Sequence, residues 1–322
     1  MTRGTRPWEA TDLGPRFGPT ARLTGPCPLR VEHSGVERHQ GDLARVRDTD
    51  ELARLDGIGQ VFTGPGPGYT SRLTHSVEVS TIAARLADGL NLSTSLAAAI
   101  GLAHDCGHPP LSHVGEEIVA SFSPTFSHAS YGAERLAASA NLSPDVLDGI
   151  RNHSWSCPNP ATPEGELVRW ADRIAYLARD FADSVTLGLA EYADLPPRVA
   201  RELGHGRDEQ VAALVDSVVT TSRRYGVVSM GEGPARALAE FRRFNLLNFY
   251  RSDLVMCQAI VNAECLRAVI ADLLRGDRVE TMVEQVLALT DLDIARRSRS
   301  GVQVPSVRPI ARSIARPSSL AS

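Results

Sequence analysis

Residues 104–116 read HDCGHPPLSHVGE and concentrate side chains that bind metal ions and transfer protons. Imidazole nitrogens and carboxylate oxygens are common ligands of divalent ions, and histidine is also the most frequent general acid or base. Six of the nine histidines fall between positions 75 and 153: His75, His104, His108, His113, His128 and His153. A single histidine is usually structural, but six on neighbouring segments indicate a site.

One metal ion is predicted from four of these side chains. His104 and Asp105 end an apolar segment that stops at Gly107, so they can offer one imidazole and one carboxylate to the same cation. His75 lies in the preceding expected helix and adds a second imidazole if the two helices pack antiparallel. Asp172 is the fourth candidate. Such a mixed nitrogen and oxygen site suits one divalent ion, without choosing among Mn, Mg, Fe, Co and Zn.

His113 and Glu116 stand three residues apart at the start of a further expected helix. This spacing lets the carboxylate orient the imidazole and raise its basicity, which is the arrangement of a general acid or base beside a metal. The same residues also suit a helix N-terminus, where Ser112 and acidic side chains are favourable. From the residues alone both interpretations stay open.

A polar stripe follows Asp172 on its helix. Tyr176, Asp180 and Asp183 lie on one side, opposite an apolar side. An acidic stripe of this kind is often a solvated face. A tyrosine inside it, and a candidate ligand at its head, favour the wall of a pocket.

The elements that carry these residues are expected to be helices. Apolar residues recur at helical spacing, no sustained alternation of period two is found, and no repeat is found. The sequence therefore predicts an all-α fold. The expected helices begin at Gly41, run over 72–89 and over 93–107 with a cap at Ser93–Ser95, and continue at 130–140, 144–151, 164–187, 208–225, 233–272, either as one helix or with a break in it, and 278–290.

Composition excludes several classes of protein. The chain has 322 residues and no lysine, so all 34 basic residues are arginine and neither a Walker A loop nor a lysine Schiff base is possible. GPGPG at 64–68 is interpreted as a turn. Five scattered cysteines favour reduced thiols over disulfides. With no signal-like N-terminus and no long apolar run, we expect a cytoplasmic protein with no membrane partner.

Three regions are predicted along the chain: an irregular segment at 1–40, one domain at 41–295 and a basic tail at 296–322. The tail holds six arginines and no acids, whereas the rest of the chain is acidic. A disordered end is the simpler interpretation of the tail. Nucleic-acid binding through it is the alternative, which salt-dependent association lost on deletion of 296–322 would favour.

RLTHSVEV, HDCGHPPLSHVGE and ADRIAYLARDFAD together resemble the HD-domain phosphohydrolases, and specifically the deoxyguanosinetriphosphate triphosphohydrolase group with its metazoan dNTPase relatives. The resemblance runs from about Asp42 to about Arg296. It implies an HD-domain helical bundle with extra C-terminal helices, one divalent ion, a nucleotide substrate and homo-oligomers. The reaction it implies is hydrolysis of a dNTP to the deoxynucleoside and inorganic triphosphate.

The resemblance also implies a role for each matching residue. His75, His104, Asp105 and Asp172 hold the metal, and His113 with Glu116 is the catalytic pair. His108 and His128 face the α-phosphate. The remaining matches contact substrate: Arg72 at the phosphates, Gln60 and Tyr176 at the deoxyribose, and Asp180 at the 3′ hydroxyl or phosphate network.

The chain departs from the family pattern at three positions. Because of these departures, the resemblance does not imply which nucleobase the chain prefers or how it is activated. Arg179 replaces a histidine, Ala53 precedes Arg54 where relatives have a second arginine, and His128 lacks the common following asparagine. The chain is also short beside long members. Two other functions stay open: an HD phosphohydrolase acting on a monophosphate or signalling nucleotide, and a nucleotide or nucleic-acid binding module with weak catalysis.

Overall fold

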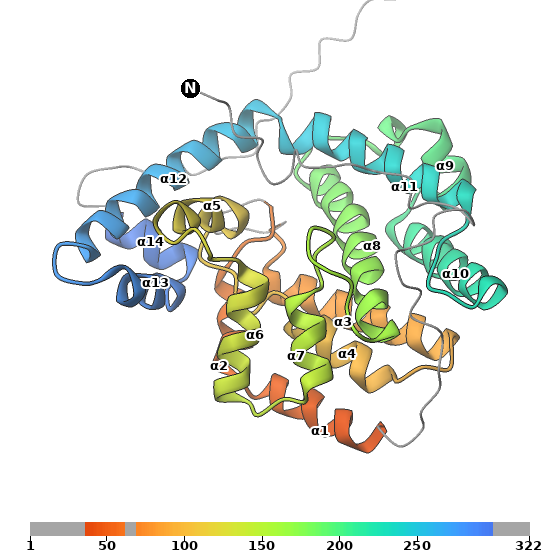
Figure 1. Cartoon of the computed structure of the whole chain (residues 1–322). Coiled ribbons are helices and arrows are strands. Elements are labelled where there is room, and N and C mark those ends of the chain that lie inside the picture. Colours follow the sequence, from red (N-terminus) through yellow and green to blue (C-terminus); the bar gives the residue numbers. More distant parts are fainter. Residues whose placement is uncertain (1–35, 62–68, 299–322) are drawn as a thin grey trace, which may run out of the picture.

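The chain folds into helices joined by short loops (Figure 1). The computed structural model describes residues 36–61 and 69–298, and within them no β-strand forms beyond one isolated bridge between Gly59 and Ser71. The all-α expectation is therefore confirmed. Residues 1–35, the GPGPG stretch and residues 299–322 lie outside the described residues, and the division at 40 and 295 stays a prediction.

Fourteen α-helices occur in the described ranges. They are α1 (Val36–Arg47), α2 (Asp50–Arg54), α3 (Arg72–Gly89), α4 (Thr94–Ala103), α5 (Ser112–Phe122), α6 (His128–Ser139), α7 (Pro144–Arg151), α8 (Pro163–Thr186), α9 (Pro197–Leu203), α10 (Arg207–Tyr225), α11 (Glu232–Asn245), α12 (Asp253–Leu273), α13 (Val279–Leu287) and α14 (Asp291–Ser298). Short turns are η2 (Leu55–Gly57), η3 (Tyr192–Asp194) and the π-helical η4 (Leu246–Tyr250).

The expected helices match most of these bounds. Ser93 caps α4 by accepting a hydrogen bond from the Leu96 amide, as expected from the serine cluster there. The stretch 233–272 is two helices, because η4 interrupts it and Ser252 caps α12 anew. The short helix α9 was not expected, and α14 continues to Ser298, beyond the expected end of the helical region.

Helix α4 is the centre of the larger core. Every residue from Ser95 to Ala103 is buried, because the helix is apolar or small on all sides and packs against α1, α3, α7 and α8. Its C-terminal end therefore lies deep in the protein. His104 and Asp105 follow directly and are placed in the interior by this burial.

A smaller core holds α5 against the C-terminal helices α12, α13 and α14. Figure 1 shows α12 along the upper left of the molecule, with α5, α14 and α13 beneath it. Buried members of this core include Leu111, Ile118, Leu266 and Val286. The loop between α4 and α5 thus joins the two cores.

Among the described residues α12 is long and apolar enough to cross a bilayer by length and composition, although only 28% of its most apolar window is buried inside the protein. Packed helices of soluble proteins pass the same test. Cys265, Leu266, Val269 and Ile270 of α12 are buried in the smaller core. The expectation of no membrane partner stays a prediction.

Gly107 is where helix α6 meets the loop after α4. A Cβ at Gly107 would lie 2.0 Å from the carbonyl oxygen of His128 and 2.5 Å from the amide nitrogen of Gly132. Both neighbours are backbone atoms that cannot move aside as a side chain can. Glycine at this position therefore allows α6 to bring His128 next to His108.

Gly107→Ala is expected to destabilise the fold by about 1–3 kcal/mol, the usual cost of overpacking. Gly276→Ala is the matched control, because a Cβ there meets no atom within 4 Å. Denaturant unfolding of both variants measures the difference. Equal stabilities would show that α6 does not need this close approach.

Candidate metal and catalytic site

The four predicted metal ligands come together from three segments. His75 of α3 and Asp172 of α8 approach to 3.0 Å between Nε2 and Oδ1. His104 Nε2 lies 3.3 Å from Asp105 Oδ2 and 3.8 Å from Asp172 Oδ1. The ligand atoms of His75, His104 and Asp172 all lie within 4.8 Å of one another, which permits a metal site.

The protonation of His104 suits a metal ligand. Its Nδ1 lies 2.8 Å from the Gly101 carbonyl, which can only accept, so Nδ1 carries the proton. Metal-bound histidines usually hold their second nitrogen in this way. Burial works to lower the pKa of His104, but Asp105 and Asp172 outweigh it and raise that pKa. A cation bound at the buried Nε2, which has no hydrogen-bond partner among the described residues, would displace a proton from it. The residues present therefore fit a divalent ion.

Both aspartates of the group are anionic. Burial works to raise the pKa of Asp105, but Arg72, His104 and His108 outweigh it and hold that pKa well below its ordinary value. For Asp172 burial is likewise outweighed, chiefly by the hydrogen bond from His75, and the pKa falls to about 2. Both carboxylates can therefore act as ligands at neutral pH.

Arg72 is buried beside this group with only 2% of its surface exposed. Its Nη1 donates to Asp105 Oδ2 at 2.5 Å and its Nε donates to Ser112 Oγ at 2.7 Å. Its Nη2 finds no acceptor among the described residues. A buried guanidinium with one free donor beside a metal site is suited to bind an oxyanion such as phosphate.

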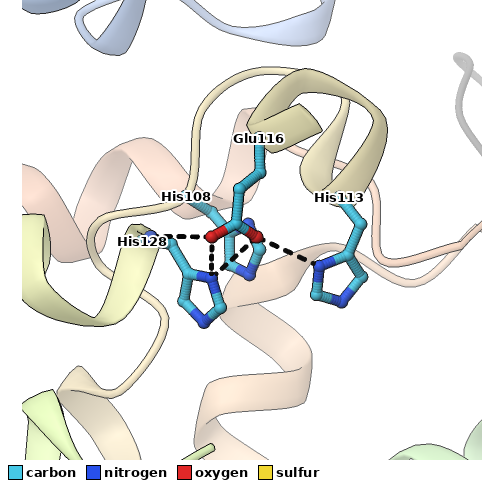
Figure 2. A group of neighbouring side chains, drawn as sticks. All are labelled: His108, His113, Glu116 and His128. Atoms are coloured by element: carbon cyan, nitrogen blue, oxygen red, sulfur yellow. Dashed lines mark hydrogen bonds and ion pairs between the residues drawn. The ribbon is translucent and has the colours of Figure 1, made fainter. Parts of the chain in front are cut away.

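Glu116 gathers the histidines predicted to act in catalysis (Figure 2). Its carboxylate lies 2.8 and 2.9 Å from Nδ1 of His128 and accepts the His128 amide at 2.9 Å. His113 Nδ1 lies farther away, at 3.4 Å. The expected His113–Glu116 pairing is present, but His128 is the closer partner. This contact depends on how α6 packs on α5, which the local spacing does not reveal.

Glu116 stays ionised in this environment. Burial works to raise its pKa, but His128 and hydrogen bonds from both histidines outweigh burial and hold the pKa far below its ordinary value. His113 has 53% of its side chain exposed, whereas His128 has 11%. Ligand atoms of His108, His113, Glu116 and His128 also lie within 4.8 Å of one another.

His108 is fully buried between the two groups. Its ring stacks on His128 with centroids 3.8 Å apart, and its Nε2 lies 3.4 Å from Asp105 Oδ1. Burial and the nearby Arg72 hold its pKa well below the ordinary value, so the ring is neutral. Neither of its nitrogens has a hydrogen-bond partner in the described part of the chain, and the same is true of Gln60 Oε1.

The polar stripe of α8 faces the interior. Asp180 is 2% exposed and accepts a hydrogen bond of 2.5 Å from the Tyr250 hydroxyl. Asp183 accepts one of 2.5 Å from the Thr70 hydroxyl, and Tyr176 is half-buried against the larger core. The alternative of a solvated face is therefore wrong. Tyr250 was not predicted, because it lies on η4, 70 residues from Asp180.

Arg54 and Asp291 form hydrogen bonds to the backbone of residues 108–111, in the loop between α4 and α5. Neither was predicted as a site residue. Asp291 accepts from the amides of Leu111 at 2.7 Å and Gly59 at 2.9 Å. Arg54 donates to the His108 carbonyl at 2.6 Å. The smaller core thereby sets the position of residues 108–112, at the N-terminal end of the helix that bears His113.

His153 also reaches the site, just after α7. Its Nε2 lies 3.1 Å from Nε2 of His128, and its ligand atom lies within 4.8 Å of those of His104 and Asp105. Burial lowers the pKa of His153 to about 3. Its place among the six clustered histidines was the signal in the sequence, but no role followed from it.

Comparison with known proteins gives the family. A family model for the HD domain matches residues 72–177. A deoxyguanosinetriphosphate triphosphohydrolase-like protein of Desulfatibacillum aliphaticivorans is 32% identical over 273 residues, 77% of this chain and 76% of that protein. The chain belongs to this dGTPase-like family. A relative from Clostridium perfringens is 34% identical over 225 residues, 65% of this chain and 66% of that protein.

A solved structure supports the same fold. The crystal structure of a hypothetical protein from Aquifex aeolicus aligns with a TM-score of 0.53 at 22% identity, covering 80% of this chain and 67% of that one. The chain is thus an HD-domain phosphohydrolase of the dGTPase-like family with a His/Asp cluster that can hold metal. The roles of individual site residues stay predictions.

Arg179, one of the departures from the family pattern, forms a structural ion pair. It donates to Glu78 of α3, and Arg207 of α10 contacts the same carboxylate oxygen at 3.0 Å. Glu78 thus joins α3 to both α8 and α10. An uncharged histidine in its place would leave Glu78 with one cation fewer.

The pKa of Asp180 predicts a pH dependence of stability. Burial raises this pKa from the ordinary 3.8 to about 7, with the Tyr250 hydrogen bond acting in the opposite direction. Between these values the folded chain binds more protons than the unfolded chain, so this group's contribution to the free energy of unfolding falls as pH rises.

Asp180→Asn removes this contribution and keeps an oxygen that accepts from Tyr250. In metal-free protein, the stability of the variant relative to wild type is therefore expected to increase from about pH 5 to about pH 8. Urea unfolding at both pH values measures it. The same relative stability at both would mean that Asp180 is already ionised at the lower pH.

Proposed function

We propose that this chain is a metal-dependent dNTP triphosphohydrolase, which converts a dNTP to the deoxynucleoside and inorganic triphosphate. The main support is one observation: the His/Asp group able to hold metal lies beside Arg72, a buried arginine with a free donor, in a member of the dGTPase-like family. This combination suits a phosphate ester bound at a metal.

The reaction adds water at the α-phosphorus and breaks the bond to the 5′ oxygen of the nucleoside. A divalent ion held by His75, His104, Asp105 and Asp172 would stabilise the negative charge that develops on the phosphate. Arg72 Nη2 is the buried donor that would bind a phosphate oxygen. His108, which is neutral, would face the same region.

The departing 5′ oxygen needs a proton, and His113 is the proposed donor. Its ring is half-exposed, and its Nδ1 lies 3.4 Å from the carboxylate of Glu116, which can orient the ring. His113 can therefore take up a proton from solvent between turnovers. Gln60, Tyr176 and Asp180 are proposed to contact the sugar, and the buried Gln60 Oε1 has no partner among the described residues.

Product analysis tests the reaction. The purified chain is incubated with each dNTP, singly and mixed, in Mn²⁺, Mg²⁺ or Co²⁺, and the phosphate products are separated. Inorganic triphosphate and deoxynucleoside in equal amounts are expected. Orthophosphate or pyrophosphate as the first product would point to another phosphohydrolase activity, and tight binding without turnover in any metal would point to a binding module.

His113→Ala is expected to lower kcat by about 10²–10⁴-fold, the usual contribution of general acid or base catalysis. Its metal content should equal that of wild type, because His113 lies outside the proposed ligand set. His205→Ala, at an exposed histidine far along the chain, is the control and should keep full activity. Full activity in His113→Ala would end this assignment.

The remaining expectations are also proposals. A homo-oligomer is supported by exposed apolar side chains on η4 and α12, where Leu247 is 51% and Ile260 60% exposed. Cytoplasmic localisation and nucleic-acid binding through the tail rest on the sequence alone.

A further inference from the structure

Helix α12 carries a stripe of exposed side chains along much of its length. Asp253, Ile260 and Arg267 follow one another at intervals of seven residues, and all three are exposed. Seven residues are close to two full turns, so successive members of such a series lie within about 20° of one another around the helix. Ile260 has 60% of its surface exposed. The stripe therefore places a large apolar side chain midway between an acid and a base.

The stretch around Ile260 is mostly apolar and yet uncovered. Residues 253–261 read DLVMCQAIV, and none of them is buried. The C-terminal half of the same helix, by contrast, packs against α5 and α14 and buries Cys265 and Leu266. A large exposed apolar side chain among apolar neighbours is typical of a surface that another molecule covers.

The charges on the stripe argue against a lipid bilayer or a nucleic acid as that molecule. Asp253, Glu264 and Arg267 are all exposed on the side of α12 that bears Ile260. Charged side chains are costly to bury in hydrocarbon. A nucleic acid requires an excess of basic side chains, whereas this stripe has two acids and one base. The covering surface must therefore itself combine apolar groups with both signs of charge.

The order of the charges fits a second copy of the same helix. Asp253 and Arg267 stand at equal distances on either side of Ile260, about 10 Å along the helix axis. If two α12 helices pack antiparallel around a two-fold axis at Ile260, Asp253 of each copy lies opposite Arg267 of the other. A parallel arrangement would bring like charges together. The stripe is thus self-complementary, as a two-fold interface requires.

Arg267 can take part in such a contact at little cost. Within its own chain its Nη1 lies 2.9 Å from Glu264 Oε1, and 55% and 64% of the two side chains are exposed. An ion pair this exposed contributes little to stability. Arg267 can therefore contact Asp253 of a second copy without losing a strong interaction.

We propose that the chain forms a two-fold dimer in which the α12 helices of two copies pack antiparallel at Ile260, with ion pairs between Asp253 and Arg267 at both ends of the contact. This inference gives a surface and an orientation to the homo-oligomer proposed above. It stands whichever reaction the chain catalyses.

Charge reversal on the full chain tests the pairing. Asp253→Arg and Arg267→Asp each place like charges opposite one another at both ends of the contact, so each should raise the dimer dissociation constant by about tenfold or more. The double variant has opposite charges again and should recover the dimer. Sedimentation velocity over a dilution series in low salt measures these constants. A single substitution that merely weakened the helix would not be rescued in this way.

Asp272→Arg is the matched control, because it makes the same change of charge at an exposed residue of α12 that lies roughly 120° away from the stripe. Its dimer should equal that of wild type. A dimer that both single variants retain would keep the homo-oligomer and overturn this interface. A monomeric wild type would overturn both, and monomers that sediment with phospholipid vesicles would identify a bilayer as the cover. None of these measurements depends on dNTP hydrolysis.

Ile260→Cys, combined with Cys257→Ser, gives a second measurement. The new thiols of two copies would face each other across the two-fold axis, where a disulfide can form because it requires Cα atoms within about 7 Å. The native Cys257 is exposed but lies one turn away from the axis. Mild oxidation should yield a covalent dimer from the double variant and none from Cys257→Ser alone. Equal cross-linking of the two proteins would contradict the antiparallel register.

Discussion

The carboxylate of Asp105 is a negative charge that the protein interior can hold only with its neighbours in place. It is 2% exposed, and Arg72, itself 2% exposed, donates to it. Removing one partner of such a buried pair typically costs about 3–5 kcal/mol, because the other charge is left unpaired. The site therefore depends on α3 and the end of α4 packing together. The apolar helix α4 brings the aspartate into this position.

The loop after Asp105 needs a second support from the end of the chain. Leu111 and Ser112 both adopt left-handed backbone conformations, with φ of 65° and 55°, which cost roughly 1–3 kcal/mol each for residues other than glycine. Asp291 accepts the Leu111 amide, and the Ser112 hydroxyl donates to the Gly59 carbonyl. The smaller core is thus part of the active-site scaffold, since α14 begins at Asp291.

Contacts within one helix, or between helices that follow each other, could be predicted from the sequence. His104 and Asp105 adjoin at a helix end, and the family pattern supplied His75 and Asp172. Contacts set by tertiary packing could not. Asp291 accepts a hydrogen bond from Leu111, which lies 180 residues away in the sequence. Glu116 lies closer to the ring of His128, 12 residues away, than to the ring of His113, three residues away. No periodicity encodes such pairs, because their distance depends on crossing angles and loop paths.

Glu116 gives two histidines different environments with one carboxylate. His128 is held by its amide and its ring, and it stacks on His108, so it has little freedom to turn. His113 has a longer contact of 3.4 Å and more than half its side chain exposed. A group that delivers a proton in each turnover must exchange it with solvent, whereas a group that faces a bound phosphate must keep its orientation. The exposed His113 suits the first task, and the buried His128 suits the second.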